Sequence, residues 1–150
     1  MLAVQSQCGH SYSFWSPVHG HDEITQPAVA MLQQVGLVDA ADRAATGLSH
    51  GEHRQLEIAM AMATNPKLLL LDEPMAGMGA DESSRMLEIF RNIKGGPGIL
   101  LIEHDMDIVF ALADRISVLV NGAIIASDTP DAIRNNQQVR AAYLGESSIA

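Results

Sequence analysis

The chain has 150 residues, of which 47% are hydrophobic and 18% are charged, a composition typical of a globular domain and not of a disordered chain. The net charge of −9, with only nine Lys and Arg residues, argues against a nucleic-acid surface, which needs clustered cations. No apolar run approaches the ~18 residues of a membrane-spanning helix, no basic residue precedes an apolar stretch near the start, and the single cysteine fits a reducing compartment.

The first part of the chain predicts a loop-rich lead-in followed by a helix. Residues 1–26 are rich in Ser, His, Gly and Pro. Residues 27–35 have helical spacing of apolar side chains, and Gly36 stands where a C-terminal cap belongs. The lead-in also holds a Cys-x-His and a His-x-His, whose types and spacing could bind zinc, but incidental histidines in an exposed loop are the favoured interpretation. These residues are Cys8, His10, His19 and His21.

The next segment predicts a capped helix and a buried strand. Ser49 and Glu52 form a capping box, in which the serine oxygen accepts the N–H three residues on and the glutamate reaches back. The inward face of this helix is predicted from its spacing as Leu56, Met60 and Ala63. The leucine run at 68–71 predicts a strand buried on both faces of a parallel sheet.

Helix and strand signals then alternate. Residues 81–93 predict a helix whose apolar stripe is core rather than a cofactor face; its members are Met86, Phe90 and Ile93. Glycines and a proline end this helix, residues 99–102 predict the next strand, and residues 107–112 predict a helix.

The C-terminal part predicts a hairpin and short helices. Asn121-Gly122, between apolar segments at 115–120 and 123–127, is a strong hairpin signal. Thr129-Pro130 begins a short helix, and residues 139–144 predict a last one. The alternation of strands and helices along the chain predicts an α/β fold with a parallel central sheet.

Two adjacent carboxylates, Asp72 and Glu73, follow the leucine strand, at the sheet edge where α/β folds bind ligands. Asp72 could hold Mg²⁺ through water, while Glu73 could orient or deprotonate an attacking water. The alternative is that Asp-Glu-Pro only caps the next element. A histidine at the end of the next strand, His104, favours the functional interpretation, because parallel neighbours end at the same edge. It could donate to a phosphate or position the water.

The residues Ser49, His50 and Gly51 begin a helix, so their N–H groups and the positive end of the helix dipole offer an anion site. On local grounds alone an ordinary capped helix is the favoured interpretation.

Together these motifs resemble the ATP-binding subunits of ABC transporters. Residues 48–52, Leu-Ser-His-Gly-Glu, are similar to the signature motif Leu-Ser-Gly-Gly-Gln. Residues 68–72 resemble the Walker B strand. Residues 76–79 lie where the D-loop belongs, with Met-Gly in place of the commoner Leu-Asp.

The resemblance implies a role for each candidate residue. Glu73 would be the catalytic glutamate and His104 the switch histidine. The residues implied to contact nucleotide are Ser49, Gly51, Glu52 and Asp72, with Asp72 acting on Mg²⁺ through water.

A finer resemblance is to the branched-chain amino acid uptake group, and it is carried by residues 56–59, 76–79, 103–106 and 143–146. Subunits of urea or short-amide importers look alike in these segments and are an alternative. The transported solute itself is selected by other subunits in this family.

The family's architecture implies a partial P-loop NTPase (RecA-like) parallel sheet flanked by helices, with part of the ABC helical subdomain and a C-terminal β-hairpin and short helices. It divides the chain into a partial helical subdomain at 1–48, the C-terminal part of the ATPase domain at 49–146, and a tail at 147–150. The implied cofactors are ATP and Mg²⁺. The implied partners are a second ATP-binding subunit and transmembrane permease subunits, with the chain cytoplasmic and peripheral on the inner face of the cell membrane.

Two family elements are missing from the sequence: the Walker A loop, Gly-x-x-x-x-Gly-Lys-Ser/Thr, and the Q-loop. We therefore expect a truncated ATP-hydrolysing subunit that is inactive alone, because the Walker A loop supplies most of the phosphate binding. The alternative is a binding module that supplies its signature in trans to a complete partner ATPase.

Overall fold

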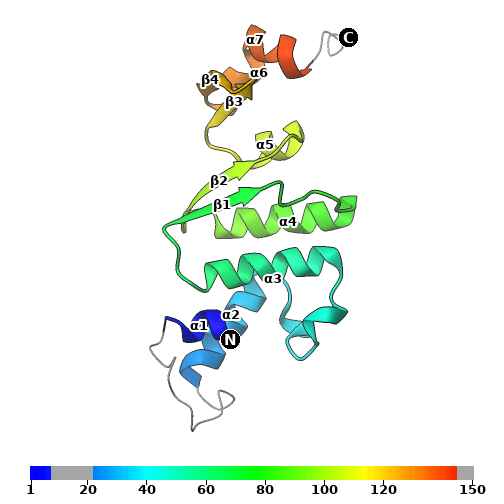
Figure 1. The fold of residues 1–150 in the computed structure, drawn as a ribbon, viewed down its shortest axis with the longest axis vertical. Helices are drawn as coiled ribbons and strands as arrows, with labels where there is room; N and C mark the ends of the chain where they lie inside the picture. The colour runs from blue at the N-terminus through cyan, green and yellow to red at the C-terminus, as the bar shows by residue number, and fades with distance from the viewer. Residues whose placement is uncertain (8–21, 145–150) are drawn as a thin grey trace. The chain divides into compact units, whose positions relative to one another are not determined.

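The computed structural model describes residues 1–7 and 22–144. The chain divides into two compact units, residues 1–102 and residues 103–150, and each is described by itself (Figure 1). Within the described ranges, no helix is both long enough and apolar enough to cross a membrane. The candidate zinc residues Cys8, His10, His19 and His21 lie outside the described residues.

Two helices open the first unit, α1 (Leu2–Gln5) and α2 (Asp22–Gln34). The prediction of a loop-rich lead-in is therefore wrong for the described part of residues 1–26, and the predicted start of the second helix is five residues late. Pro27, the residue at which the predicted helix begins, lies inside α2. The helix begins earlier than predicted because its first turn carries Ile24, which is buried against Val4 of α1.

The predicted end of α2 is confirmed. Gly36 has φ +72°, a left-handed conformation that glycine adopts without steric cost. Its N–H donates to the carbonyl of Gln33 at 3.1 Å, and the N–H of Leu37 donates to the carbonyl of Leu32 at 2.8 Å. This pair of bonds is a Schellman cap, which satisfies carbonyls that the helix end leaves open.

Short 3₁₀ turns at Val38–Ala40 and Ala45–Gly47 lead into α3 (His50–Met62). The predicted inward face of α3 is wrong at Met60, which is 54% exposed, whereas Ile58 and Ala59 are buried. Leu56 and Ala63 are half-buried. Helical spacing alone fits a buried stripe through Met60 as well as one through Ile58 and Ala59. Which of the two is buried depends on the neighbouring element that covers the helix.

A parallel pair of strands, β1 (Leu68–Asp72) and β2 (Gly98–Ile102), follows the predicted order, with α4 (Ala80–Ile93) between them in sequence. Figure 1 shows α4 between the two strands and α3. The predicted core stripe of α4 is confirmed, with one further member, and its buried residues are Met86, Ile89, Phe90 and Ile93.

The prediction that the leucine strand is buried on both faces is wrong. Leu69 is buried at 6%, but Leu70 is 65% exposed and Leu100 on the paired strand is 55% exposed. Side chains on a strand alternate between faces, so one face of this two-stranded sheet meets the helices and the other is uncovered. The exposed apolar face, formed by Leu68, Leu70, Leu100 and Ile102, is defined here as the bare face.

The second unit contains a helix, a hairpin and short helical segments. Its elements are α5 (Met106–Leu112), β3 (Ile116–Val120), β4 (Ala123–Asp128), α6 (Pro130–Asn135), α7 (Gln137–Val139) and a π-helical turn (Arg140–Leu144).

The predicted hairpin turn is confirmed, because Asn121 and Gly122 both have positive φ and β3 pairs antiparallel with β4, as a type I′ turn requires. An irregularity at Val118/Leu119 shifts the register. The hairpin and the helices share a core centred on buried Ile133 and Val139.

Candidate functional site

The two strand-end carboxylates lie at the carboxyl edge of the parallel pair. Asp72 is the last residue of β1 and pairs in register with Ile102, the last residue of β2. The N–H of Glu73 donates to the carbonyl of Ile102 at 2.9 Å, which continues the ladder one residue beyond the strand. Asp72 and Glu73 are both exposed. The backbone therefore fixes both carboxylates at this edge while leaving their side chains accessible.

Glu73 has an unusual backbone conformation, with φ +43°. A non-glycine residue in the left-handed region costs free energy, and such residues cluster at functional sites. Buried Pro74 and Met75 follow it, and the N–H of Ala76 donates to the carbonyl of Glu73 at 3.1 Å. The turn after the strand is thus anchored in the core, and it holds Glu73 in its strained geometry.

The same turn leads through residues 76–79 into α4. The N–H of Met78 donates to the carbonyl of Met75 at 3.2 Å, and Gly77 has φ +76°. A Cβ on Gly77 would lie 4.0 Å from Nε2 of His50. This approach places the segment that resembles a D-loop beside the start of α3, where the signature-like residues lie.

The predicted capping box at the start of α3 is confirmed. The Glu52 N–H donates to Oγ of Ser49 at 3.2 Å, and the Ser49 N–H donates to Oε2 of Glu52 at 2.7 Å. The N–H groups of His50 and Gly51 stand in the first turn, where no helical carbonyl precedes them. Because the helix dipole also places positive potential here, this end of α3 is suited to an anion.

Arg43 clamps the capping box from outside the helix. Its Nη1 donates to Oε1 of Glu52 at 3.0 Å and its Nη2 donates to Oε2 at 3.3 Å, while Nη2 also donates to the carbonyl of Gly47 at 2.6 Å. The hydrogen bond from the Ser49 backbone, followed by the one from Arg43, lowers the pKa of the Glu52 carboxyl below its ordinary value. Sequence reasoning missed Arg43, because it lies in an irregular segment without periodicity.

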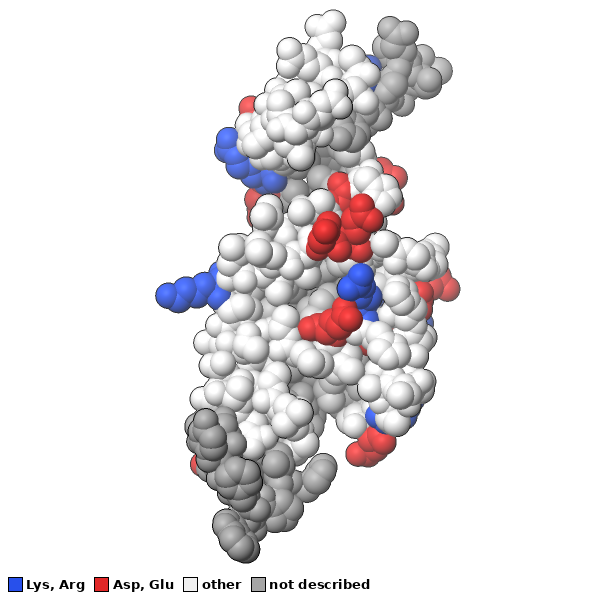
Figure 2. Space-filling view, in the orientation of Figure 1, with Lys and Arg blue, Asp and Glu red and all other residues white. Residues whose placement is uncertain are grey.

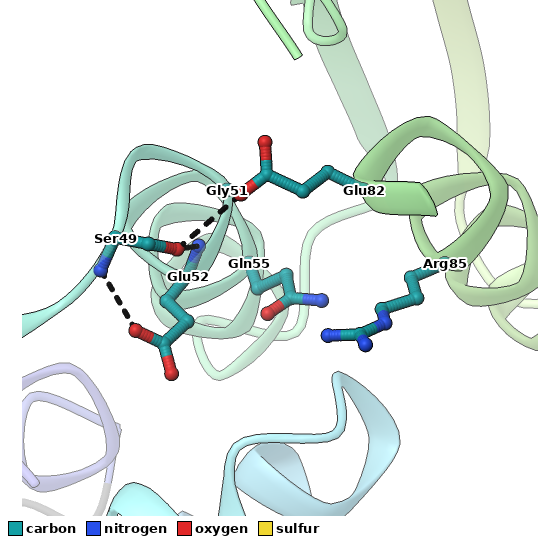
Figure 3. Close-up of a pocket in the computed structure, with 6 residues that line it drawn as sticks. All are labelled: Ser49, Gly51, Glu52, Gln55, Glu82 and Arg85. Atoms are coloured by element: carbon teal, nitrogen blue, oxygen red, sulfur yellow. Dashed lines mark hydrogen bonds between the residues drawn. The ribbon is translucent and has the colours of Figure 1, made fainter. Parts of the chain in front are cut away.

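A small hollow opens between α3 and α4, and Figure 3 shows its lining residues: Ser49, Gly51, Glu52, Gln55, Glu82 and Arg85. Glu82 reaches from the first turn of α4 toward Ser49 and Gly51 (Figure 3). The Ser49 hydroxyl donates to Oε1 of Glu82 at 3.4 Å. Sequence reasoning missed this contact as well, although Glu82 stands at the position that favours a capping glutamate.

The structure thus brings together part of the predicted site. Ser49, Gly51 and Glu52 lie with Glu82 and the glycine turn at 76–79 on one unit, and Asp72 and Glu73 lie at the strand edge of that same unit. His104 is exposed, between β2 and α5, and belongs to the unit formed by residues 103–150. Its approach to Glu73 therefore stays a prediction.

The residues present fit two parts of a nucleotide-binding site. An exposed carboxylate such as Asp72 is the oxygen donor that Mg²⁺ prefers, usually through water. The first turn of α3 offers N–H groups and the Ser49 hydroxyl to phosphate oxygens. Among residues 1–7 and 22–144, no group of three or more His, Cys, Asp and Glu side chains is placed to hold a metal ion. The fit to Mg²⁺ is thus that of one carboxylate and not of a closed metal cage.

The face shown in Figure 2 carries Lys and Arg atoms at scattered places rather than in one patch. This distribution agrees with the low count of basic residues. Phosphate-rich polymers need a continuous basic surface, and the described residues drawn on this face do not form one.

Comparison with known proteins gives two family matches. The family described as "ABC transporter" matches residues 2–76, and the family described as "Branched-chain amino acid ATP-binding cassette transporter" matches residues 123–148.

Individual relatives agree with these matches. The chain is 43% identical over 126 residues to the high-affinity branched-chain amino acid transport ATP-binding protein LivG of Escherichia coli, covering 83% of this chain and 49% of LivG. It is 40% identical over 126 residues to BraF of Pseudomonas aeruginosa, a protein of the same description, with the same coverage. The chain therefore spans about half the length of the curated relatives that it matches.

A solved structure agrees as well. MJ1267, described as an ATP-binding cassette of an ABC transporter, superposes with a TM-score of 0.74 at 33% identity, covering 89% of this chain and 54% of that one.

Proposed function

Because the chain belongs to the ABC transporter ATP-binding family, we propose that it is part of an ATP-hydrolysing subunit of an importer for branched-chain amino acids. One observation carries the proposal: a capped signature-like helix start, a strand ending in Asp72 and Glu73, and a glycine turn at 76–79 follow one another on one compact unit. The relatives LivG and BraF and the match at residues 123–148 support the proposal that the importer carries branched-chain amino acids.

Each candidate residue has a proposed task. Asp72 holds Mg²⁺ through water, and the cation neutralises phosphate charge. Glu73 orients or deprotonates the attacking water, a role that suits an exposed carboxylate held by a strained backbone. His104 donates to the terminal phosphate. Ser49 presents its hydroxyl and Gly51 presents its N–H to the ATP of a second subunit, and Glu52 fixes Ser49 by accepting its N–H.

The proposed partners follow from the same reasoning. A second ATP-binding subunit completes the signature contact, and permease subunits supply the membrane path. The chain is then peripheral on the cytoplasmic face of the membrane.

A chimera tests this proposal. The segment of Escherichia coli LivG that aligns with this chain is replaced by the chain, and ATP hydrolysis is measured with Mg²⁺. We expect hydrolysis, and we expect Glu73→Gln to lower kcat by at least ~100-fold, the usual contribution of a positioned base. A Glu88→Gln chimera, which removes the same charge from an exposed position on α4, serves as the matched control. Hydrolysis that is insensitive to Glu73→Gln would refute the catalytic assignment.

A second candidate function is a non-catalytic module that supplies only the signature in trans. The observation that favours it is the fully built start of α3, which is capped by Ser49 and held by Arg43 through Glu52. Under both candidates the 150-residue chain alone shows no Mg²⁺-dependent ATPase activity above its Glu73→Gln variant. Robust turnover that depends on Glu73 would contradict both.

A further inference from the structure

The carboxylate of Glu82 occupies the space directly above the signature-like turn. A Cβ built on Gly51 would lie 2.7 Å from Oε1 of Glu82, 2.8 Å from its Cδ and 3.2 Å from its Cγ. Such distances are inside van der Waals contact, so only a glycine at position 51 leaves room for this carboxylate. The side chain of Glu82 is half-buried there.

The hydroxyl of Ser49 is shared between two partners. It accepts the N–H of Glu52 at 3.2 Å and donates to Oε1 of Glu82 at 3.4 Å. A serine hydroxyl has one proton to donate. While Glu82 accepts that proton, a phosphate oxygen cannot, so a phosphate that binds Ser49 has to replace the glutamate.

Charge makes the competition stronger. The Glu82 carboxylate and a phosphate are both anions, and they would stand at the same end of α3. The other charged groups that line the hollow are Glu52, which Arg43 already neutralises, and Arg85, one turn further along α4. Phosphate therefore meets an anion already lying against Ser49 and Gly51.

The other oxygen of Glu82 links this contact to the glycine turn. Oε2 of Glu82 accepts the N–H of Gly79 at 3.4 Å, the residue that precedes α4. A single carboxylate thus contacts the turn at 76–79 and the signature-like residues at 49–51.

We propose that Glu82 is a positioning residue that competes with nucleotide phosphate for Ser49 and Gly51. Its carboxylate blocks these two residues until a bound nucleotide displaces it. The proposal rests on the proposed function, because it takes the signature as a nucleotide contact. It also assigns Gly51 a second task, that of leaving room for the Glu82 side chain.

The test compares Glu82→Gln with wild type. Glutamine keeps the capping of α4, since Glu and Gln both serve at this position, but it removes the charge. Each protein is titrated into full-length Escherichia coli LivG with Mg²⁺ and a non-hydrolysable ATP analogue, and the dissociation constant is measured by native mass spectrometry. We expect Glu82→Gln to tighten nucleotide-dependent association about fivefold, which corresponds to about 1 kcal/mol. Glu88→Gln, the matched control on the same helix, should leave it unchanged.

An unchanged or weaker association of Glu82→Gln, with wild type associating normally, would overturn the proposal. A wild type that never associates would instead count against the proposed function. In that case a partner-free measurement decides the role of Glu82: the amide signals of Ser49 and Gly51 are followed by NMR while tripolyphosphate is added. A shift at lower tripolyphosphate concentration in Glu82→Gln than in wild type supports the competition, and equal titrations refute it.

Discussion

Replacing Gly51 by alanine tests the geometry of the hollow directly. Within a helix, alanine is more stable than glycine by about 0.5–1 kcal/mol, because glycine loses more conformational freedom on folding. In wild type, however, the new Cβ would lie 2.7 Å from Oε1 of Glu82. The carboxylate must then swing away and lose its bond from Ser49, and one such bond contributes about 0.5–1.5 kcal/mol. We therefore expect Gly51→Ala to be neutral or mildly destabilising in wild type.

The same substitution in a Glu82→Ala background no longer meets the three nearest atoms, all of which belong to the Glu82 side chain, and should stabilise the chain by about 0.5–1 kcal/mol. The free energy of unfolding of the four proteins, measured by urea titration with far-UV circular dichroism, gives the coupling between the two sites. Gly47→Ala is the matched control, because a Cβ there has no neighbour within 4 Å, and it should show no coupling to Glu82. Equal stabilisation by Gly51→Ala in both backgrounds would refute the placement of the Glu82 carboxylate.

Three further predictions concern the cap, its charge and the bare face. Ser49→Ala should lower the free energy of unfolding by about 1 kcal/mol, the usual value of an N-cap, and Ser49→Thr should restore most of it in urea titrations. Folding depresses the pKa of Glu52, so the contribution of this carboxylate to stability is present above its unfolded pKa, near 4.3, and is lost as the pH falls through the folded pKa. Between pH 7 and pH 3 the urea midpoint should therefore fall less in Glu52→Gln than in wild type. Parallel curves of midpoint against pH would contradict this. The double substitution Leu70→Lys and Leu100→Lys should reduce self-association in light scattering, since these side chains are 65% and 55% exposed and apolar faces of this kind drive association; unchanged association would show that the bare face is not responsible.

Elements with a strong local signal could be predicted from the sequence. The capping box at Ser49, the hairpin turn at Asn121 and the glycine cap at Gly36 each depend on residues within a few positions, and the structure contains all three. The parallel pairing of β1 with β2 also followed, because a helix between two apolar runs leaves little other choice.

Features that depend on distant neighbours could not be predicted in this way. The burial of Leu70 depends on what covers the second face of the sheet, and a run of leucines does not contain that information. The Arg43 clamp and the Glu82 contact join residues nine and thirty-three positions apart, and no periodicity links them. The family resemblance supplied residue types for the candidate site, whereas the contacts that hold Ser49 came from residues outside its own helix: Glu82 of α4 contacts it directly, and Arg43 acts through Glu52.

The central claim is that this chain presents a signature to nucleotide held by a second subunit, and nucleotide-dependent pairing tests it most directly. Native mass spectrometry of the chain with full-length Escherichia coli LivG, with and without Mg²⁺ and a non-hydrolysable ATP analogue, measures the fraction of heterodimer. We predict heterodimers only when nucleotide is present, and their loss when Ser49→Arg fills the space that a phosphate would occupy. Absence of heterodimers at saturating nucleotide, or heterodimers that form equally with Ser49→Arg, would contradict the claim.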